Sequence, residues 1–196
     1  YQFADGGFLI HPCMFPLRNK VWQHNPSLIL SGIIFLSLLT TCRKEEKTKL
    51  SGESVISTKL YGTGPYYTYG FSFSTGKNYP YPGTSSVRID LVAQALTDPQ
   101  GNLTGVVLAS PDNDKAFYTN GTFGDSSSAL AFFSSYTEAE TTTFSPLSDT
   151  IVANQVLTYR SVVPTYAKIL ITSVRFLPDN LTGQYAEIAF RWVYQP

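Results

Sequence analysis

Histidine, cysteine and methionine are nearly absent from this chain of 196 residues. The two histidines (His11 and His24), Met14 and Cys13 all precede Cys42, and none of these residue types follows it. The chain after Cys42 therefore cannot form a Ser-His-Asp or Cys-His nucleophile, a thiolate or imidazole zinc site, or a disulfide. Haem held by axial His or Met side chains is excluded for the same reason. We expect no metal and no cofactor there.

An excess of charge of either sign is also missing. The sequence holds 14 Lys and Arg residues against 14 Asp and Glu residues. Residues after 41 carry a net charge near −1, because only Arg18, Lys20 and Asp5 are charged before that point. Without a basic stripe the chain cannot neutralise a row of phosphates, so nucleic acid is not an expected partner.

The apolar run at 27–41 is too short for an ordinary membrane span. It has 15 residues, whereas a helix that crosses a bilayer needs roughly 20. Arg18 and Lys20 precede it, and small polar residues and a cysteine follow it. This order is typical of a signal peptide. We interpret 14–41 as the signal peptide, with Met14 as the translation start and 1–13 as upstream or fragment residues.

The residues around Cys42 carry a more specific signal. Leu39-Thr40-Thr41-Cys42 resembles a lipobox, although Thr41 departs from the Gly, Ala or Ser usual before the cysteine. Lys44, Glu45 and Glu46 resemble the surface-export signal of Bacteroidota lipoproteins. The resemblance implies a mature protein that begins at Cys42, is acylated there (palmitate being one such chain), and is held in the outer membrane at the cell surface. Several acyl chains anchor stably where one does not. A single-span anchor with a charged flank is the alternative.

The remainder predicts one mainly β domain. We interpret 42–58 as a charged, then small and polar, lipidated tether, and 59–196 as a single β-rich domain. Short runs of alternating apolar and polar residues, separated by Gly, Pro and Asn, predict antiparallel strands. The segment 155–176 predicts a hairpin that turns near Pro164 and Thr165. The expected fold is an antiparallel β-sandwich or curled sheet with one short amphipathic helix.

That helix is predicted over 125–139. Asp125 is an N-cap candidate, and apolar residues recur at helical spacing at Ala129, Phe132, Phe133 and Tyr136. We expect this stripe to pack on the sheet.

The C-terminal half resembles a family. The segment 154–176 (NQVLTYRSVVPTYAKILITSVRF), followed by YAEIAFRWVYQ, resembles the C-terminal sheet of HmuY-type β-rich lipoproteins. The segment 101–138 resembles small Bacteroidota lipoproteins with an aromatic strand and an A-x-x-F-F helix. HmuY-type proteins capture haem through paired His or Met side chains. Because neither residue follows Cys42 here, no haem ligand or other functional residue carries over.

The tyrosine-rich segments 62–70 and 76–86 suggest a ligand surface. Tyr66, Tyr67, Tyr79 and Tyr81 are candidates for stacking on sugar faces, since large amphipathic rings suit wet binding surfaces. The competing interpretation is that some of these rings alternate into the core and others decorate loops. We expect a non-catalytic binding or accessory lipoprotein, with glycan capture beside an outer-membrane importer as the leading hypothesis.

Two other functions remain open. A neutral β domain can serve as a structural subunit of a cell-surface complex or fibre that assembles by strand addition. A hydrolase that uses carboxylates alone is the third hypothesis, although no catalytic residue can be named. The acids are expected mainly as caps and solvated residues: Asp90, Asp112, Asp125, Glu138 and Glu187. Asp149-Thr150-Ile151 resembles a Bacteroidota O-glycosylation pattern, which makes Thr150 a candidate acceptor.

Replacing Cys42 tests the lipoprotein hypothesis. Cys42→Ala should leave an uncut precursor that no longer partitions with the outer membrane. The variant lacks the cysteine that is acylated and that the signal peptidase recognises. Changing Lys44, Glu45 and Glu46 to Ala should preserve acylation but hide the protein from externally added protease. Mass spectrometry and membrane fractionation measure both results. A single-span anchor predicts that Cys42→Ala changes neither size nor membrane association.

Overall fold

Most of the described part of the chain is built from β-strands. The computed structural model describes residues 50–61, 67–83, 86–137, 143–163 and 165–195. Within this part the protein is mainly β, with antiparallel sheets and one helix, as the sequence predicted. No helix in the described ranges is both long and apolar enough to cross a membrane.

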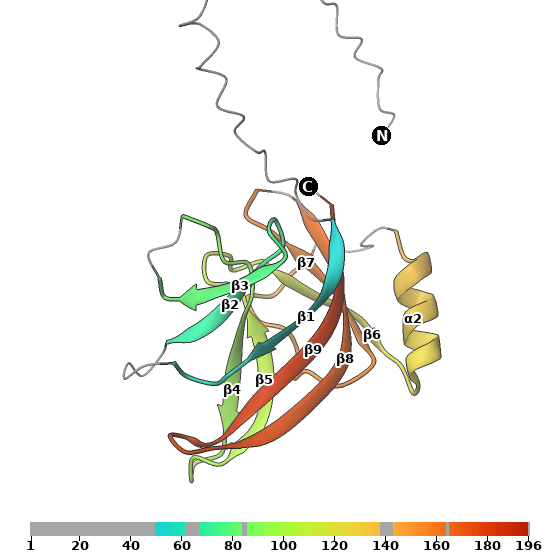
Figure 1. Ribbon diagram of the computed structural model, residues 1–196. Coiled ribbons are helices and arrows are strands. Elements are labelled where there is room, and N and C mark those ends of the chain that lie inside the picture. The colour runs from blue at the N-terminus through green and yellow to red at the C-terminus, as the bar shows by residue number, and fades with distance from the viewer. Residues whose placement is uncertain (1–49, 62–66, 84–85, 138–142, 164, 196) are drawn as a thin grey trace, which may run out of the picture. The chain divides into compact units, whose positions relative to one another are not determined.

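The larger sheet has five antiparallel strands in the order β1-β9-β8-β7-β6 (Figure 1). Their bounds are Ser51–Ser57 for β1, Gly183–Gln195 for β9, Tyr166–Asp179 for β8, Gln155–Arg160 for β7 and Phe117–Thr122 for β6. The pairing of β7 with β8 confirms the predicted hairpin. The longest pairing joins β8 to β9, and β8 is the middle strand of the sheet.

Two antiparallel hairpins form the opposing layer (Figure 1). One consists of β2 (Thr68–Ser72) and β3 (Lys77–Tyr81), and the other of β4 (Val92–Thr97) and β5 (Leu103–Ala109). An isolated bridge just before β4 connects the first hairpin to the second.

The core between the layers is rich in aromatic rings. Phe71 of β2 meets Phe190 and Trp192 of β9 edge-on, with ring centroids 5.3 and 5.5 Å apart. Phe73, just after β2, packs against Tyr159 of β7 at 5.2 Å. Each such ring contributes roughly 1.5–3 kcal/mol by leaving water, and edge-on pairs add to that. These contacts join the β2-β3 hairpin to the larger sheet.

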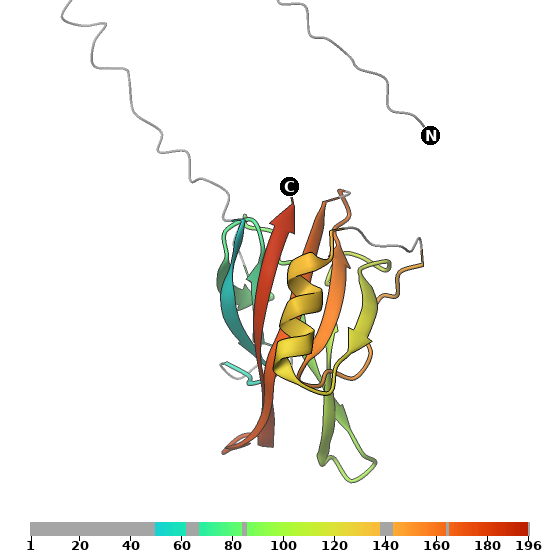
Figure 2. The same ribbon diagram turned by 90° about the vertical axis from the view of Figure 1, so that its right-hand side faces the viewer.

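The predicted helix forms as α2, Ser126–Ser135, on the outer face of the larger sheet (Figure 2). Asp125 is its N-cap and accepts a hydrogen bond from the Ser128 backbone N at 2.8 Å. Hydrogen bonds from the side chains of Ser127 and Ser128 and from the Ser128 backbone lower the pKa of Asp125 to about 2. Ala129 and Phe133 are buried against β7 and β8. The helix is shorter than predicted because Tyr136 is already extended.

Lys168 of β8 closes the C-terminal end of the helix. Its Nζ donates to the carbonyl oxygens of Phe133 and Tyr136 at 2.8 and 2.6 Å. These carbonyls lack an intrahelical partner, and a cation there also complements the helix dipole. Partial burial lowers the pKa of Lys168. One side chain thus fastens the helix to the sheet.

The prediction that 42–58 forms a tether is wrong for residues 51–57. Residues 51–57, expected to hang free, form β1 and pair with β9 in register from Ser51 with Val193 to Ser57 with Glu187. Ile56 is only 2% exposed. The segment SGESVIS has two adjacent apolar residues and otherwise small or charged ones, so no period-two apolar pattern marks it as a strand. Pairing with β9 supplies what its own sequence does not indicate.

Removing the Lys168 ammonium tests how the helix is held. Lys168→Met keeps the apolar stem but leaves two helix carbonyls without a donor, so we expect a loss of about 1–2 kcal/mol in unfolding free energy. Urea denaturation measures it. Lys115→Met, at an exposed lysine, is the matched control and should change stability by less than about 0.5 kcal/mol. Equal losses in the two variants would contradict the capping role.

Candidate functional site

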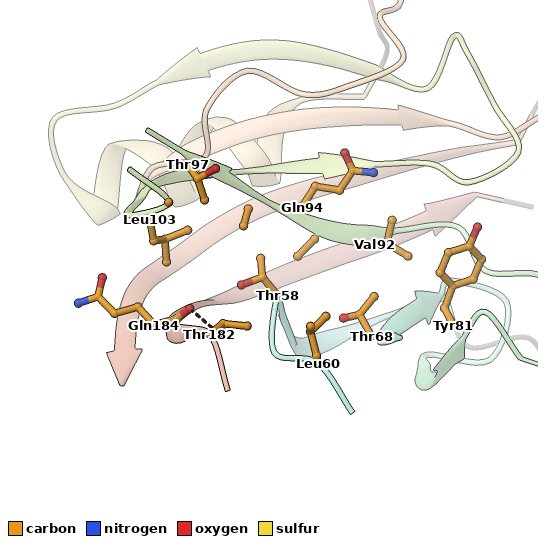
Figure 3. A pocket seen from close by; sticks show the side chains of 13 residues that line it. Thr58, Leu60, Thr68, Tyr81, Val92, Gln94, Thr97, Leu103, Thr182 and Gln184 are labelled. Atoms are coloured by element: carbon orange, nitrogen blue, oxygen red, sulfur yellow. Dashed lines mark hydrogen bonds between the residues drawn. The ribbon is translucent and has the colours of Figure 1, made fainter. Parts of the chain in front are cut away.

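A pocket of about 550 Å³ opens at one end of the domain, among segments far apart in sequence. Its walls come from the β4-β5 hairpin, with Gln94 and Leu103, and from the turn between β8 and β9, with Thr182 and Gln184. The β1–β2 connection and the ends of β2 and β3 complete the lining, as Figure 3 shows. Pockets that take small ligands commonly have volumes of roughly 300–1,000 Å³.

An aspartate shapes the turn on the β8-β9 side. The Asp179 carboxylate accepts hydrogen bonds from the backbone N of Leu181 and Thr182 and from Thr182 Oγ1, at 2.9–3.3 Å. These bonds, above all the one from the Thr182 side chain, lower the pKa of Asp179. Gly183 follows with φ +76°, a conformation that costs glycine little. The turn therefore holds Thr182 and Gln184 at the rim.

A second aspartate shapes the turn of the β4-β5 hairpin. Asp98 accepts from the backbone N of Gln100 and Asn102 and from Asn102 Nδ2, at 2.7–3.0 Å. Hydrogen bonds from Asn102 are the main reason that the pKa of Asp98 is lowered. Gly101 takes φ +86° and lines the pocket. Both walls are thus fixed by short-range hydrogen bonds to a carboxylate.

The pocket lining carries no charged side chain among the described residues. Three of its threonine hydroxyls are already bonded within the domain: Thr58, Thr68 and Thr182. Within the described ranges, the side-chain amides of Gln94 and Gln184 have no hydrogen-bond partner and are exposed. The described lining therefore presents two amides, the Tyr81 side chain and apolar surface, with no charged side chain.

The pocket lies far from the point where β1 begins. The start of β1 pairs with the end of β9, whereas its last residue, Ser57, pairs with Glu187, near the β8–β9 turn. Thr58 and Leu60 of the pocket follow directly. Seven residues of strand separate the two ends by roughly 20 Å. A chain that approaches Ser51 from a surface would hold the pocket away from that surface.

The four predicted stacking tyrosines do not form one platform in the described part of the chain. Tyr66 lies outside the described residues. Tyr67 joins Tyr61 and Tyr69 in an exposed cluster, where Tyr61 meets the other rings at centroid distances of 5.7 and 5.0 Å and interplanar angles of 38° and 47°. These rings are tilted, not coplanar.

Tyr79 and Tyr81 turn the other way from that cluster. Both pack against a small buried cluster of Ile89, Val92 and Ala109. They alternate with Pro80 along β3 and are half-buried. Tyr81 alone of the four candidate rings is part of the described pocket lining.

The lipidation and export candidates Cys42, Lys44, Glu45 and Glu46 lie outside the described residues. Thr150 lies in an exposed loop, beside the buried Ile151, whose backbone N donates to Val106 O at 2.8 Å.

Asp90 is not on a solvated face, as its alternating context had suggested, but is buried. It is 7% exposed, and its Oδ2 accepts a hydrogen bond from the Phe73 backbone N at 2.8 Å. Its Oδ1 accepts from the Tyr159 hydroxyl at 3.2 Å, and that hydroxyl also contacts Ser110 Oγ. Burial raises the pKa of Asp90, with these bonds and nearby Arg88 opposing the rise. Burial likewise raises the pKa of Tyr159. Both carboxylate oxygens are engaged inside the core.

The other acids have mixed outcomes. Asp125 caps the helix as predicted. Glu187 forms an ion pair with Arg175 across β8 and β9, and Asp112 is exposed. Glu138 lies outside the described residues. Among the described residues, no three His, Cys, Asp or Glu side chains gather closely enough to hold a metal ion.

Sequence reasoning missed most of the pocket, including Gln94, Gln184 and Thr182. The available signal was a pair of similar turns, DPQG at 98–101 and DNLTG at 179–183. Each is typical of a hairpin turn. That the two turns face each other depends on how the layers pack.

In comparisons with known proteins, no family model, curated protein or solved structure matches this chain.

The buried carboxylate predicts a pH dependence of stability. The pKa of Asp90 is raised in the folded protein above its ordinary value of about 3.9. Its contribution to stability is therefore full below about pH 4 and is lost as the pH rises through the folded pKa, because the folded protein retains a proton that the unfolded chain releases. The unfolding free energy of Asp90→Asn, compared with that of the unmodified protein, should therefore increase as the pH rises from 4 to 7. Urea denaturation at several pH values measures the difference.

Asp149→Asn, which removes a carboxylate from an exposed loop, is the matched control and should not reproduce that trend. A stability difference for Asp90→Asn that stays constant or shrinks with rising pH would contradict the assignment.

Proposed function

We propose that the protein is a non-catalytic binding module that captures a neutral glycan in the pocket between its two hairpin turns. It is displayed on the cell surface by an acylated Cys42, beside an outer-membrane importer that receives the ligand. The observation that carries the proposal is the uncharged lining, with the Tyr81 ring and two unpartnered amides among its described residues. Amides exchange hydrogen bonds with sugar hydroxyls, and a tyrosine ring packs on sugar C–H groups.

The position of the pocket supports the same function. Cys42 is eight residues before Leu50, where the described domain begins. Eight residues span at most about 29 Å when extended. Because the pocket lies at the opposite end of β1 from Ser51, a lipid anchor at Cys42 leaves it accessible to soluble glycans. The exposed tyrosine cluster lies at the start of β2, near Thr68 of the pocket.

The sheet edges favour capture over assembly by strand addition. On edge strand β1, the Val55 carbonyl accepts a hydrogen bond from Asn78 Nδ2 at 2.7 Å. On edge strand β6, Phe117 exchanges backbone hydrogen bonds with Ser145 at 2.9 Å. An added strand must displace such bonds, since edges blunted in this way resist pairing. A carboxylate-only hydrolase gains no support from Asp90, whose oxygens are engaged in the core.

Shortening a rim amide tests the pocket. Gln94→Ala should weaken glycan binding about fivefold or more, since it removes hydrogen bonds worth about 1 kcal/mol each. Residues 46–196 form one compact unit of the chain. A glycan array with this unit identifies the ligand class, and calorimetry measures the affinities. Gln100→Ala, an exposed glutamine in the same hairpin but outside the pocket lining, is the matched control. Tyr67→Ala probes the aromatic cluster separately.

Two results would contradict the proposal. One is an array without binding across polysaccharide classes. The other is equal affinity for the Gln94→Ala and unmodified proteins together with a loss on Tyr67→Ala, which would move the binding site to the exposed tyrosines.

A further inference from the structure

A second pocket, of about 340 Å³, is also lined by Tyr81. Its lining includes Pro80, Pro82, Arg88 and Asp112. Tyr81 is the only residue that belongs to the linings of both this pocket and the uncharged one, within the described ranges. The half-buried Tyr81 therefore borders two cavities, each within the size range of roughly 300–1,000 Å³ that small ligands occupy.

The second pocket differs chemically from the first. It holds a guanidinium and a carboxylate, and within the described part of the chain Arg88 and Asp112 have neither a hydrogen bond from their side chains nor an ion-pair partner. Arg88 is half-buried, whereas Asp112 is exposed. Arg88 acts on Asp90 only through its charge, because the Asp90 oxygens accept hydrogen bonds from Phe73 and Tyr159. Both charged groups are thus available to a ligand.

Arg88 and Asp112 complement a sugar better than an ion. The guanidinium donates hydrogen bonds to hydroxyl oxygens and the carboxylate accepts from hydroxyl groups, and such charge-assisted bonds are the stronger kind. An anion would meet the Asp112 charge and a cation the Arg88 charge. Tyr81, Pro80 and Pro82 add apolar surface for the C–H face of a ring.

We propose that the two pockets are adjacent subsites for one oligosaccharide that crosses Tyr81, so that the protein selects chains of two or more sugar units over single sugars. This inference rests on the proposed function. The uncharged pocket holds one part of the chain through Gln94 and Gln184, and the charged pocket holds a following unit through Arg88 and Asp112. Because one ligand fills both subsites, the second contact is intramolecular and strengthens binding without a second association cost.

The test is the dependence of affinity on chain length. Xylo-, cello-, malto- and manno-oligosaccharides of one to six units are titrated into the domain 46–196, with NMR shift changes as the readout for weak binders and calorimetry for tight ones. Within the series that binds, affinity should rise about tenfold or more from one unit to three or four units and then level off.

Charge removal in the second pocket should act on that rise. Arg88→Gln and Asp112→Asn should each reduce the gain with chain length about fivefold or more, whereas Gln94→Ala should weaken binding of short and long chains alike. Asp112 is exposed, so its variant should fold even if Arg88→Gln does not, and Asp114→Asn, at a neighbouring exposed acid outside the pocket lining, is the matched control.

The outcomes separate this inference from the function it rests on. Affinity that depends on Gln94 but not on chain length would overturn the two-subsite inference and leave the glycan proposal intact. A gain with chain length that Asp112→Asn leaves unaltered would also overturn the assignment of the charged pocket. Absence of binding at every length would overturn both.

Discussion

The contact of Phe71 with Phe190 and Trp192 joins the two layers of the domain. Phe71 comes from a strand of five residues that pairs along its length with β3 and meets Leu91, just before β4, in an isolated bridge. A two-stranded hairpin is at best marginally stable by itself in water, so its position depends on this aromatic packing against β9. The same packing sets Thr68 at one end of β2 and, through the β2-β3 register, Tyr81 beside it. Both residues line the uncharged pocket. The pocket is therefore a consequence of how the layers dock.

Asp90 is buried where the two layers dock, and its hydrogen bonds connect them. A carboxylate that loses water is destabilised unless polar groups replace the water. Here the backbone N of Phe73 and the hydroxyl of Tyr159 take that role, from two different layers. An apolar residue would avoid the desolvation cost but would leave the Phe73 N–H without its acceptor and the Tyr159 hydroxyl with Ser110 Oγ as its partner. The network thus fixes the relative position of β2 and β7, much as Lys168 fixes the helix on the outer face.

In the candidate site, the residues that hold the two turns in place differ from the residues whose polar groups are unbonded. The carboxylates of Asp98 and Asp179 accept hydrogen bonds from backbone N–H groups of their own turns. These bonds hold the shape of the pocket walls. Gln94 and Gln184, which are exposed residues of the pocket lining, keep their amides unbonded within the described residues. Preorganised walls would reduce the ordering cost of binding the proposed ligand, and the unbonded amides would be available for hydrogen bonds to it. No His, Met or Cys follows Cys42 in the sequence.

The sequence by itself determined the mainly β class, the β7-β8 hairpin and the helix with Asp125 as its cap, because these depend on local periodicity and on side chains that bond their own neighbours. It also excluded thiol, imidazole and thioether chemistry after Cys42, since composition alone decides that. It failed for β1, whose segment SGESVIS becomes a strand only by pairing with β9, more than 120 residues away. It failed for Asp90, whose burial depends on β2 and β7. Tertiary packing, which the sequence did not show, places Tyr81 in the pocket lining and Tyr67 in a separate cluster. Side-chain alternation says which face a residue takes, but not what the rest of the chain places against that face.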